Sequence, residues 1–316
     1  MTTSGSINFN QTRDEIIYDA LSMIRVVEFG ESLSIDDINL GTRVLNRLVK
    51  SWQQQGVHLW KKKEATLFLA KDTNSYLLGG SSGTHATESY VSTALSADAA
   101  IGVTTLTVTS TTGMSTNDFI GVVLDDNTLF WATVNTVISS TSVSINNALL
   151  VAASSGNYIF SYTTKITRPL FILAARRFLV SSNQEIPMIV YSHEEYYELP
   201  NKTSSGASTT VNYDPQLGSG IFKLWQTPSN IANLIKFTYG KSIEDFDSLS
   251  DYSDFPQEWL EAIVLNLATK LAYHYGKATA PDFQSLKQDA AMELERAKTF
   301  DSEPGSVFFQ PTQYRS

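Results

Sequence analysis

The chain has 316 residues, of which 42% are hydrophobic, so it can bury a substantial core in one large domain or two moderate ones. It contains no cysteine, which excludes disulfides and thiolate sites. A formal charge of −9 argues against a body that grips nucleic acid, because sequence-independent affinity comes from Lys and Arg on phosphates. We expect a soluble, unexported protein, since no leader pattern and no run of roughly 20 apolar residues is present.

The first 60 residues predict two amphipathic helices that pair as a hairpin. Thr12-Arg13-Asp14-Glu15 has the form of a capping box, in which the first and fourth residues cap one another. Gly30 follows the first apolar stripe as a stop signal. Ser34 begins a second stripe, which ends near Gly56.

The next part of the chain predicts strands. Residues 65–70 have strand composition, and residues 76–78 look like their hairpin partner. From Lys71 to Lys165 there is no Lys or Arg in between, and small or hydroxylated residues dominate. Short strands are expected at residues 105–109, 119–124, 129–137 and 142–145. Residues 83–163 are therefore predicted to form an inserted all-β domain of the sandwich or barrel type.

After residue 163 the more charged composition returns. Strand-like runs cover residues 171–173, 188–191, 221–225 and 235–239. Pro256 opens a strong helix that ends before Gly276, and Pro281 opens another helix. We therefore predict an α+β fold. Residues 1–82 and 164–300 would form a discontinuous, mainly helical domain with small β-sheet elements, interrupted by the insertion and followed by an extended tail, 301–316.

The predicted tail is polar except for four apolar or aromatic residues. They are Val307, Phe308, Phe309 and Tyr314. Such residues on a solvated terminus need a partner surface, so the tail either folds back on its own domain or docks on a neighbour.

Catalytic and metal-binding patterns are weak. The four histidines lie far apart and none has metal-ligand spacing. Gly79-Gly80-Ser81-Ser82-Gly83 matches G-x-S-x-G, but no apolar helix follows, which favours a linker over a nucleophile elbow. The pairs Asp125-Asp126 and Glu194-Glu195 are adjacent carboxylates, which point apart in a strand. We predict no catalytic residue, no metal and no cofactor.

Two groups of residues leave alternatives open. Lys61, Lys62 and Lys63 are candidates for contact with DNA phosphates, and a solvated face or a partner contact is the alternative. Trp131 beside Phe130 in the insertion is either a core plug or a small recognition patch.

Several short segments follow one another in an order that characterises one family of phage proteins. They are Leu45-Asn46-Arg47-Leu48 with Trp52, Tyr76-Leu77-Leu78-Gly79, Arg168-Pro169-Leu170, Ser192-His193-Glu194-Glu195-Tyr196, Tyr213-Asp214-Pro215, Leu224-Trp225-Gln226-Thr227-Pro228 and Phe255-Pro256-Gln257-Glu258-Trp259. In these segments the chain resembles the podoviral head-to-tail adaptors, the P22-like tail accessory factors. The all-β insertion departs from that pattern.

The resemblance implies a structural virion protein of the tail or neck, present in the host cytoplasm during assembly, rather than an enzyme. It implies a homo-oligomeric ring of about twelve copies. The ring would bind the portal protein, extend the DNA channel, retain the packaged genome and support the downstream nozzle or tail tube proteins. No membrane partner is expected. Packaged double-stranded DNA would pass without sequence-specific binding, helped during ejection by the acidic balance.

The resemblance also implies that the C-terminal part reaches the portal. Candidates for the portal or neighbour interface are Phe283, Leu286, Val307, Phe308, Phe309 and Tyr314, and DNA-proximal candidates are Lys61, Lys62 and Lys63. Two alternatives remain at this point. One is a virion-associated cell-wall hydrolase, which needs convergent carboxylates. The other is a glycan-binding or adhesion protein that displays the β-domain.

Overall fold

The structure, a computed structural model, describes residues 5–28, 30–54, 59–80 and 82–301. The chain divides into two compact units, residues 1–60 with 243–316 and residues 61–242. We call the first the helical unit and the second the β unit. Each is described by itself.

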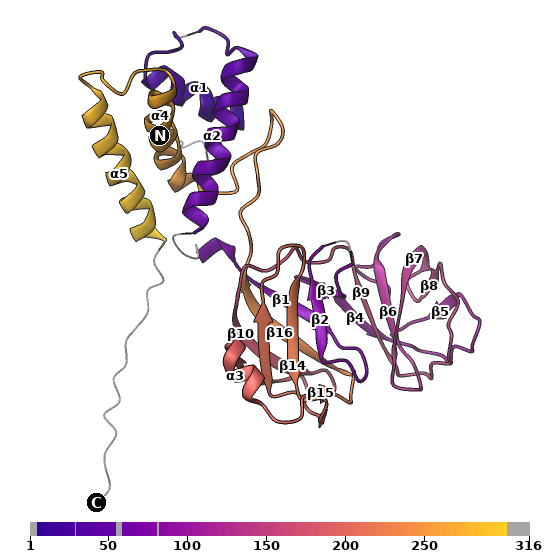
Figure 1. The fold of residues 1–316 in the computed structure, drawn as a ribbon. Helices are drawn as coiled ribbons and strands as arrows, with labels where there is room; N and C mark the ends of the chain where they lie inside the picture. Colours follow the sequence, from indigo (N-terminus) through magenta and orange to yellow (C-terminus); the bar gives the residue numbers. More distant parts are fainter. Residues whose placement is uncertain (1–4, 29, 55–58, 81, 302–316) are drawn as a thin grey trace, which may run out of the picture. The chain divides into compact units, whose positions relative to one another are not determined.

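The helical unit is built around α4. Its helices within the described residues are α1 (Arg13–Met23), α2 (Ile35–Gln53), α4 (Leu260–His274) and α5 (Phe283–Phe300), with a 3-10 turn, η2 (Gln257–Trp259), before α4. A second turn, η1 (Leu59–Lys61), lies where the two units join in sequence. Helix α4 contacts α1, α2 and α5, and it is buried along most of its length (Figure 1).

The predicted start signals of the first two helices are confirmed. The Thr12 backbone N–H donates to Oε2 of Glu15 at 2.8 Å, and the Glu15 N–H donates back to the Thr12 hydroxyl at 3.4 Å. Ser34 caps α2 by accepting from the Asp37 N–H at 3.2 Å. These bonds satisfy backbone donors that the first turn of a helix leaves without partners.

Helices α1 and α2 meet at Gly41. A Cβ atom at this position would lie 2.6 Å from Cγ2 of Ile17, so only glycine allows the two helices to approach so closely. Beyond this crossing, one aromatic cluster closes the core. It consists of Trp52, Trp60, Phe255 and Trp259, in which the rings of Phe255 and Trp259 lie 5.6 Å from each other and 5.3 to 6.0 Å from those of Trp52 and Trp60, measured between centroids.

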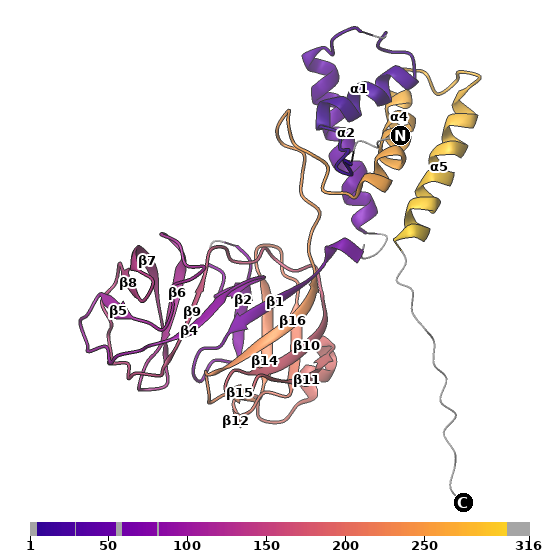
Figure 2. The same cartoon turned by 180° about the vertical axis from the view of Figure 1, so that it is seen from behind.

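The β unit contains an eight-stranded sheet, seen from both sides in Figures 1 and 2. Its order is β2 (Ser75–Leu78), β14 (Gly220–Trp225), β13 (Thr210–Asp214), β11 (Gln184–Tyr191), β10 (Ile172–Leu179), β16 (Asn233–Gly240), β1 (Lys62–Phe68) and β3 (Ala86–Thr87). The sheet is nearly closed, because the Thr84 N–H beside β3 donates to the Leu77 carbonyl of β2 at 2.7 Å. Phe222 and Phe237 contact each other in its interior, with ring centroids 5.2 Å apart.

The insertion forms a second sheet with its own core. The order is β4 (Val91–Ala94), β9 (Tyr158–Tyr162), β6 (Phe119–Val123), β7 (Leu129–Ser139), β8 (Ser142–Ile145) and β5 (Thr105–Thr107). The four strands predicted here are confirmed, whereas β4 and β9 were not predicted. Smaller elements of the β unit are α3 (His193–Glu198) and the pair β12 (Ser205–Gly206) and β15 (Thr227–Pro228).

The predicted mainly helical α+β fold is wrong, because the structure is mainly β. The described residues contain 16 strands, with 31% of residues in strands and 26% in helices. The strand-like runs after residue 163 are parts of long strands, in which charged residues such as Arg176 and Arg177 hide the pattern. Segments 62–80 and 164–240 therefore lie in one unit with the insertion, and not with the helices as the predicted domain boundaries had it.

The predicted hairpin of residues 65–70 with 76–78 is also wrong. Strand β1 pairs with β16 and β3, whereas β2 pairs with β14. Among the described helices, none is long and apolar enough to cross a membrane.

Replacing Gly41 with alanine should destabilise the helical unit, although alanine is favoured over glycine by about 1 kcal/mol inside an exposed helix. The new Cβ would force α1 and α2 apart, and such overpacking typically costs about 1–3 kcal/mol. Chemical denaturation, monitored by far-ultraviolet circular dichroism, measures the free energy of unfolding. The matched control is Gly218→Ala, which has open space around its Cβ and should change stability by less than about 0.5 kcal/mol. Equal stability of Gly41→Ala and the unchanged protein would contradict the prediction.

Candidate functional site

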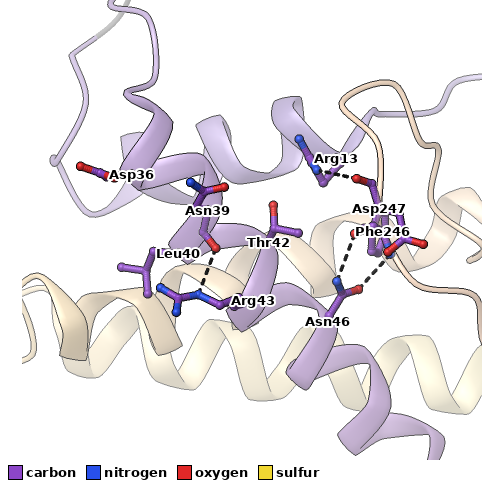
Figure 3. A pocket seen from close by; sticks show the side chains of 9 residues that line it. All are labelled: Arg13, Asp36, Asn39, Leu40, Thr42, Arg43, Asn46, Phe246 and Asp247. Carbon is purple, nitrogen blue, oxygen red and sulfur yellow. Dashed lines mark hydrogen bonds between the residues drawn. The ribbon is translucent and has the colours of Figure 1, made fainter.

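A groove of about 840 Å³ runs along the exposed side of α2 (Figure 3). The residues that line it are Arg13, Asp36, Asn39, Leu40, Thr42, Arg43, Asn46, Phe246 and Asp247. We call it the α2 groove. Its lining combines guanidinium, amide and carboxylate groups with few apolar side chains, which suits a polar partner.

The chain that borders the α2 groove is fixed by an amide clamp. The Asn46 side chain accepts from the Phe246 N–H at 2.9 Å and donates to the Phe246 carbonyl at 3.1 Å, as a neighbouring strand would (Figure 3). Arg13 is buried at one end, where it pairs with Asp14 at 2.9 Å and donates to the Asp247 carbonyl at 3.4 Å. Arg13 is therefore a structural residue whose donors are engaged.

Two arginines of α2 are exposed. Arg43 and Arg47 lie one helical turn apart, and their Nε atoms donate to the helix carbonyls of Asn39 and Arg43 at 3.3 and 3.4 Å. Neither guanidinium forms an ion pair with a residue that the structure describes. The next basic residue, Lys50, pairs with Asp245 at 2.8 Å. The exposed face of α2 thus offers two guanidinium groups for binding an anionic partner, Arg43 in the α2 groove and Arg47 one turn further along the helix.

These arginines stand out because the excess negative charge is confined to the helical unit. Residues 61–242 hold 12 Lys or Arg and 12 Asp or Glu. The rest of the chain holds 11 basic and 20 acidic residues, so the whole formal charge of −9 belongs to it. Arg43 and Arg47 were not predicted as functional residues, although their i, i+4 spacing on the polar side of a predicted helix is visible in the sequence.

The predicted interface residues fall in different places. Phe283 is only 6% exposed and packs edge-on against Tyr273 at 5.4 Å, inside the core of the helical unit. Leu286 is half-buried against the same core. The other four candidates, Val307, Phe308, Phe309 and Tyr314, lie outside the described residues.

The three lysines predicted to lie near DNA do not share one surface. Lys61 is 4% exposed, Lys62 is half-buried and Lys63 is exposed. Lys62 and Lys63 are neighbours on β1, so their side chains point to opposite faces of the sheet.

No group of three or more His, Asp or Glu side chains in the described residues is placed to hold a metal ion. His193 and His274 are exposed, and His58 lies outside the described residues. The predicted linker at residues 79–83 is in part a tight turn. Gly79 and Gly80 have positive φ, and a Cβ on Gly79 would lie 2.3 Å from the backbone nitrogen of Arg168.

His85 and Trp131 join the two sheets of the β unit. Their rings stack at 3.7 Å, and His85 Nδ1 lies 2.5 Å from the Tyr162 hydroxyl. Trp131 also meets Phe68 of β1 edge-on at 5.1 Å. Of the two alternatives for Trp131, these contacts favour the core plug. Burial of the imidazole, assisted by the positive charge of Lys165, lowers the pKa of His85 to about 3.

The comparisons with known proteins add no relative. No protein-family model matches the chain, and no curated protein matches its sequence. The candidate site therefore rests on the geometry given above.

Phe283→Ala should lower the free energy of unfolding of the helical unit by roughly 3–5 kcal/mol, because it removes a buried ring. Met292→Ala, on the exposed side of the same helix, is the matched control and should cost less than about 0.5 kcal/mol. Denaturant titration of both variants measures the difference. If Phe283→Ala were as stable as the control, the ring would be free for an interface role.

The β unit should lose stability in acid through His85. The unfolded chain binds the imidazole proton with a pKa of about 6.5, so between that value and about 3 the unfolded state holds more protons than the folded state. The stabilisation from the neutral ring is complete above about pH 6.5 and decreases as the pH falls. In a series of Tm measurements, His85→Phe should flatten this dependence, whereas His274→Phe, an exposed control, should not. An unchanged slope for His85→Phe would count against the prediction.

Proposed function

We propose that this protein is a structural head-to-tail adaptor of a short-tailed phage, and that it works as a ring rather than as an enzyme. The single observation that carries the proposal is that the segments resembling this adaptor family contact one another in space. Trp52 and Trp259, about two hundred residues apart, have ring centroids separated by 5.7 Å. A signature whose parts pack together is stronger than one of scattered short matches.

The β unit supports the proposal in the same way. The Tyr213 hydroxyl donates to the Pro169 carbonyl at 2.5 Å, and so joins the Tyr-Asp-Pro segment to the Arg-Pro segment. The Tyr196 hydroxyl donates to the Leu224 carbonyl at 3.4 Å, and so joins two more. The segments that carry the resemblance thus include residues that contact one another within the helical unit and within the β unit.

In the proposed role the ring binds the portal protein, extends the DNA channel, retains the genome and supports the nozzle or tail tube proteins. The protein would act in the virion neck after assembly in the host cytoplasm. A net negative charge suits a channel that double-stranded DNA passes without sequence-specific binding, since like charges keep the polymer from adhering. For the glycan-binding alternative, Trp131 is packed between the sheets and is a poor recognition residue.

Mixing the purified chain with the portal protein of the same phage tests the proposal. We expect light scattering or native mass spectrometry to show a stoichiometric ring of this chain on the portal. A variant that ends at Asp301 tests the tail and should bind the portal more weakly. If the full chain stayed monomeric and did not bind the portal, the adaptor function would be wrong, and a muramidase assay and a glycan array would test the two alternatives.

A further inference from the structure

We propose that copies of this chain associate head to tail, with the exposed arginines of α2 in one copy seated in the acidic groove between α1 and α4 of the next. This inference rests on the proposed ring function and identifies the two surfaces that would meet. The first surface, the basic α2 face, consists of Asn39, Arg43 and Arg47. The second is called the α1–α4 groove.

The α1–α4 groove has a volume of about 450 Å³ and lies within the helical unit. The residues that line it are Phe9, Gln11, Asp19, Ser22, Met23, Gln257, Leu260, Glu261 and Val264. Asp19 accepts a hydrogen bond from Gln11 at 2.7 Å, and Glu261 is exposed. Neither carboxylate forms an ion pair with a described residue, so the groove has negative charge available for a basic partner.

Apolar side chains border the same groove. Phe9 is 69% exposed and Met23 is 43% exposed, while Leu260 and Val264 form a buried floor. Exposed apolar groups beside unpaired charges are typical of a protein interface, in which apolar area gives affinity and charge gives register. A helix laid in the groove would cover the exposed apolar side chains and the carboxylates at the same time.

The basic α2 face has the complementary chemistry. Arg43 and Arg47 are separated by four residues, which is a rise of about 6 Å along a helix. Each has a planar guanidinium that can bind a carboxylate through two hydrogen bonds. Asn39 extends the row by one more turn with a side-chain amide. Two arginines in a row can thus face carboxylates presented by two different helices, Asp19 from α1 and Glu261 from α4.

The two surfaces satisfy the requirement for a ring. A heterologous contact needs two different patches on each copy, and repetition of that contact closes a ring when the rotation allows it. The α2 groove, which contains Arg43, and the α1–α4 groove share no lining residue, so one copy can use both at the same time. DNA phosphate is the other occupant that arginines suit, but the helical unit carries all of the excess negative charge and would repel it.

Disulfide trapping tests the contact directly, because the natural chain has no cysteine. Arg47→Cys and Glu261→Cys proteins are mixed, with and without portal, under mild oxidation. We expect a covalent dimer from the mixture and little from either protein alone. Lys287→Cys, exposed on α5, replaces Glu261→Cys in the matched control and should give no dimer. If the control mixture and the test mixture gave equal dimer, the proposed contact would be wrong.

Charge reversal gives a second, independent readout. Arg43→Glu with Arg47→Glu should weaken self-association by about tenfold or more, as should Asp19→Lys with Glu261→Lys, because each leaves like charges opposed. Mixing the two double variants should restore association, which also shows that both are folded. Sedimentation velocity of each protein and of the mixture measures this.

The outcomes separate this inference from the adaptor function. If both double variants form the wild-type ring on the portal, or if mixing them restores nothing, the interface lies elsewhere while the adaptor function stands. If the arginine variant keeps its self-association but loses binding to a double-stranded DNA duplex, the basic α2 face contacts DNA and the inference is overturned. If the unchanged chain neither assembles nor binds the portal, the adaptor function itself fails.

Discussion

The backbone groups at the two ends of the eight-stranded sheet impose the constraint on which the β unit depends. The edge strands of a sheet carry rows of unpaired donors and acceptors, which must be paired, covered or charged. Here β2 and β3 nearly close the sheet through the bond from Thr84 to Leu77. The turn that allows this needs glycine at residue 79, because the Arg168 backbone occupies the place of a side chain.

The same closure explains why a whole domain can be inserted after β3. The insertion begins and ends at adjacent points, since the Ile166 N–H donates to the Ala86 carbonyl at 2.9 Å and the Thr87 hydroxyl donates to the Thr164 carbonyl at 2.9 Å. An extra domain joined by two neighbouring chain segments does not disturb the host sheet. The stacked pair of His85 and Trp131 then packs the added sheet onto β1.

The sequence predicted those features that depend on local signals. Thr12 and Ser34 cap their helices through residues three positions away, and both helices begin where these signals place them. The pairing of β1 was not predictable in this way, because its partner β16 lies far away in sequence. The greater part of strand β10, beyond residue 173, was not predicted for a related reason. Its Arg176 is compensated by Glu64 of β1 and Glu185 of β11, and a single sequence does not show that these strands meet.

The candidate surfaces show the same limit. Phe283 was an interface candidate because the resemblance implies that the C-terminal part reaches the portal, but it lies on an apolar helix stripe, and a stripe of this kind faces the protein's own core first. The arginines of α2 belong to the polar side of a helix, where charged residues are ordinary. Their meaning comes from two facts that only the structure supplies, namely that no described carboxylate pairs with them and that the unit around them is strongly acidic.

The confinement of charge to the helical unit has a consequence for assembly. Helical units that each carry the full excess charge of −9 repel one another. At physiological salt this repulsion decays over about 8 Å. A short-range contact between guanidinium and carboxylate groups is screened much less when it is partly desolvated. Repulsion between the net charges of the units, combined with a directional attraction between guanidinium and carboxylate groups, disfavours random aggregation and selects one register between neighbours. For the proposed ring, an acidic unit with two exposed arginines on one helix face would therefore favour ordered self-assembly more than evenly mixed charge would.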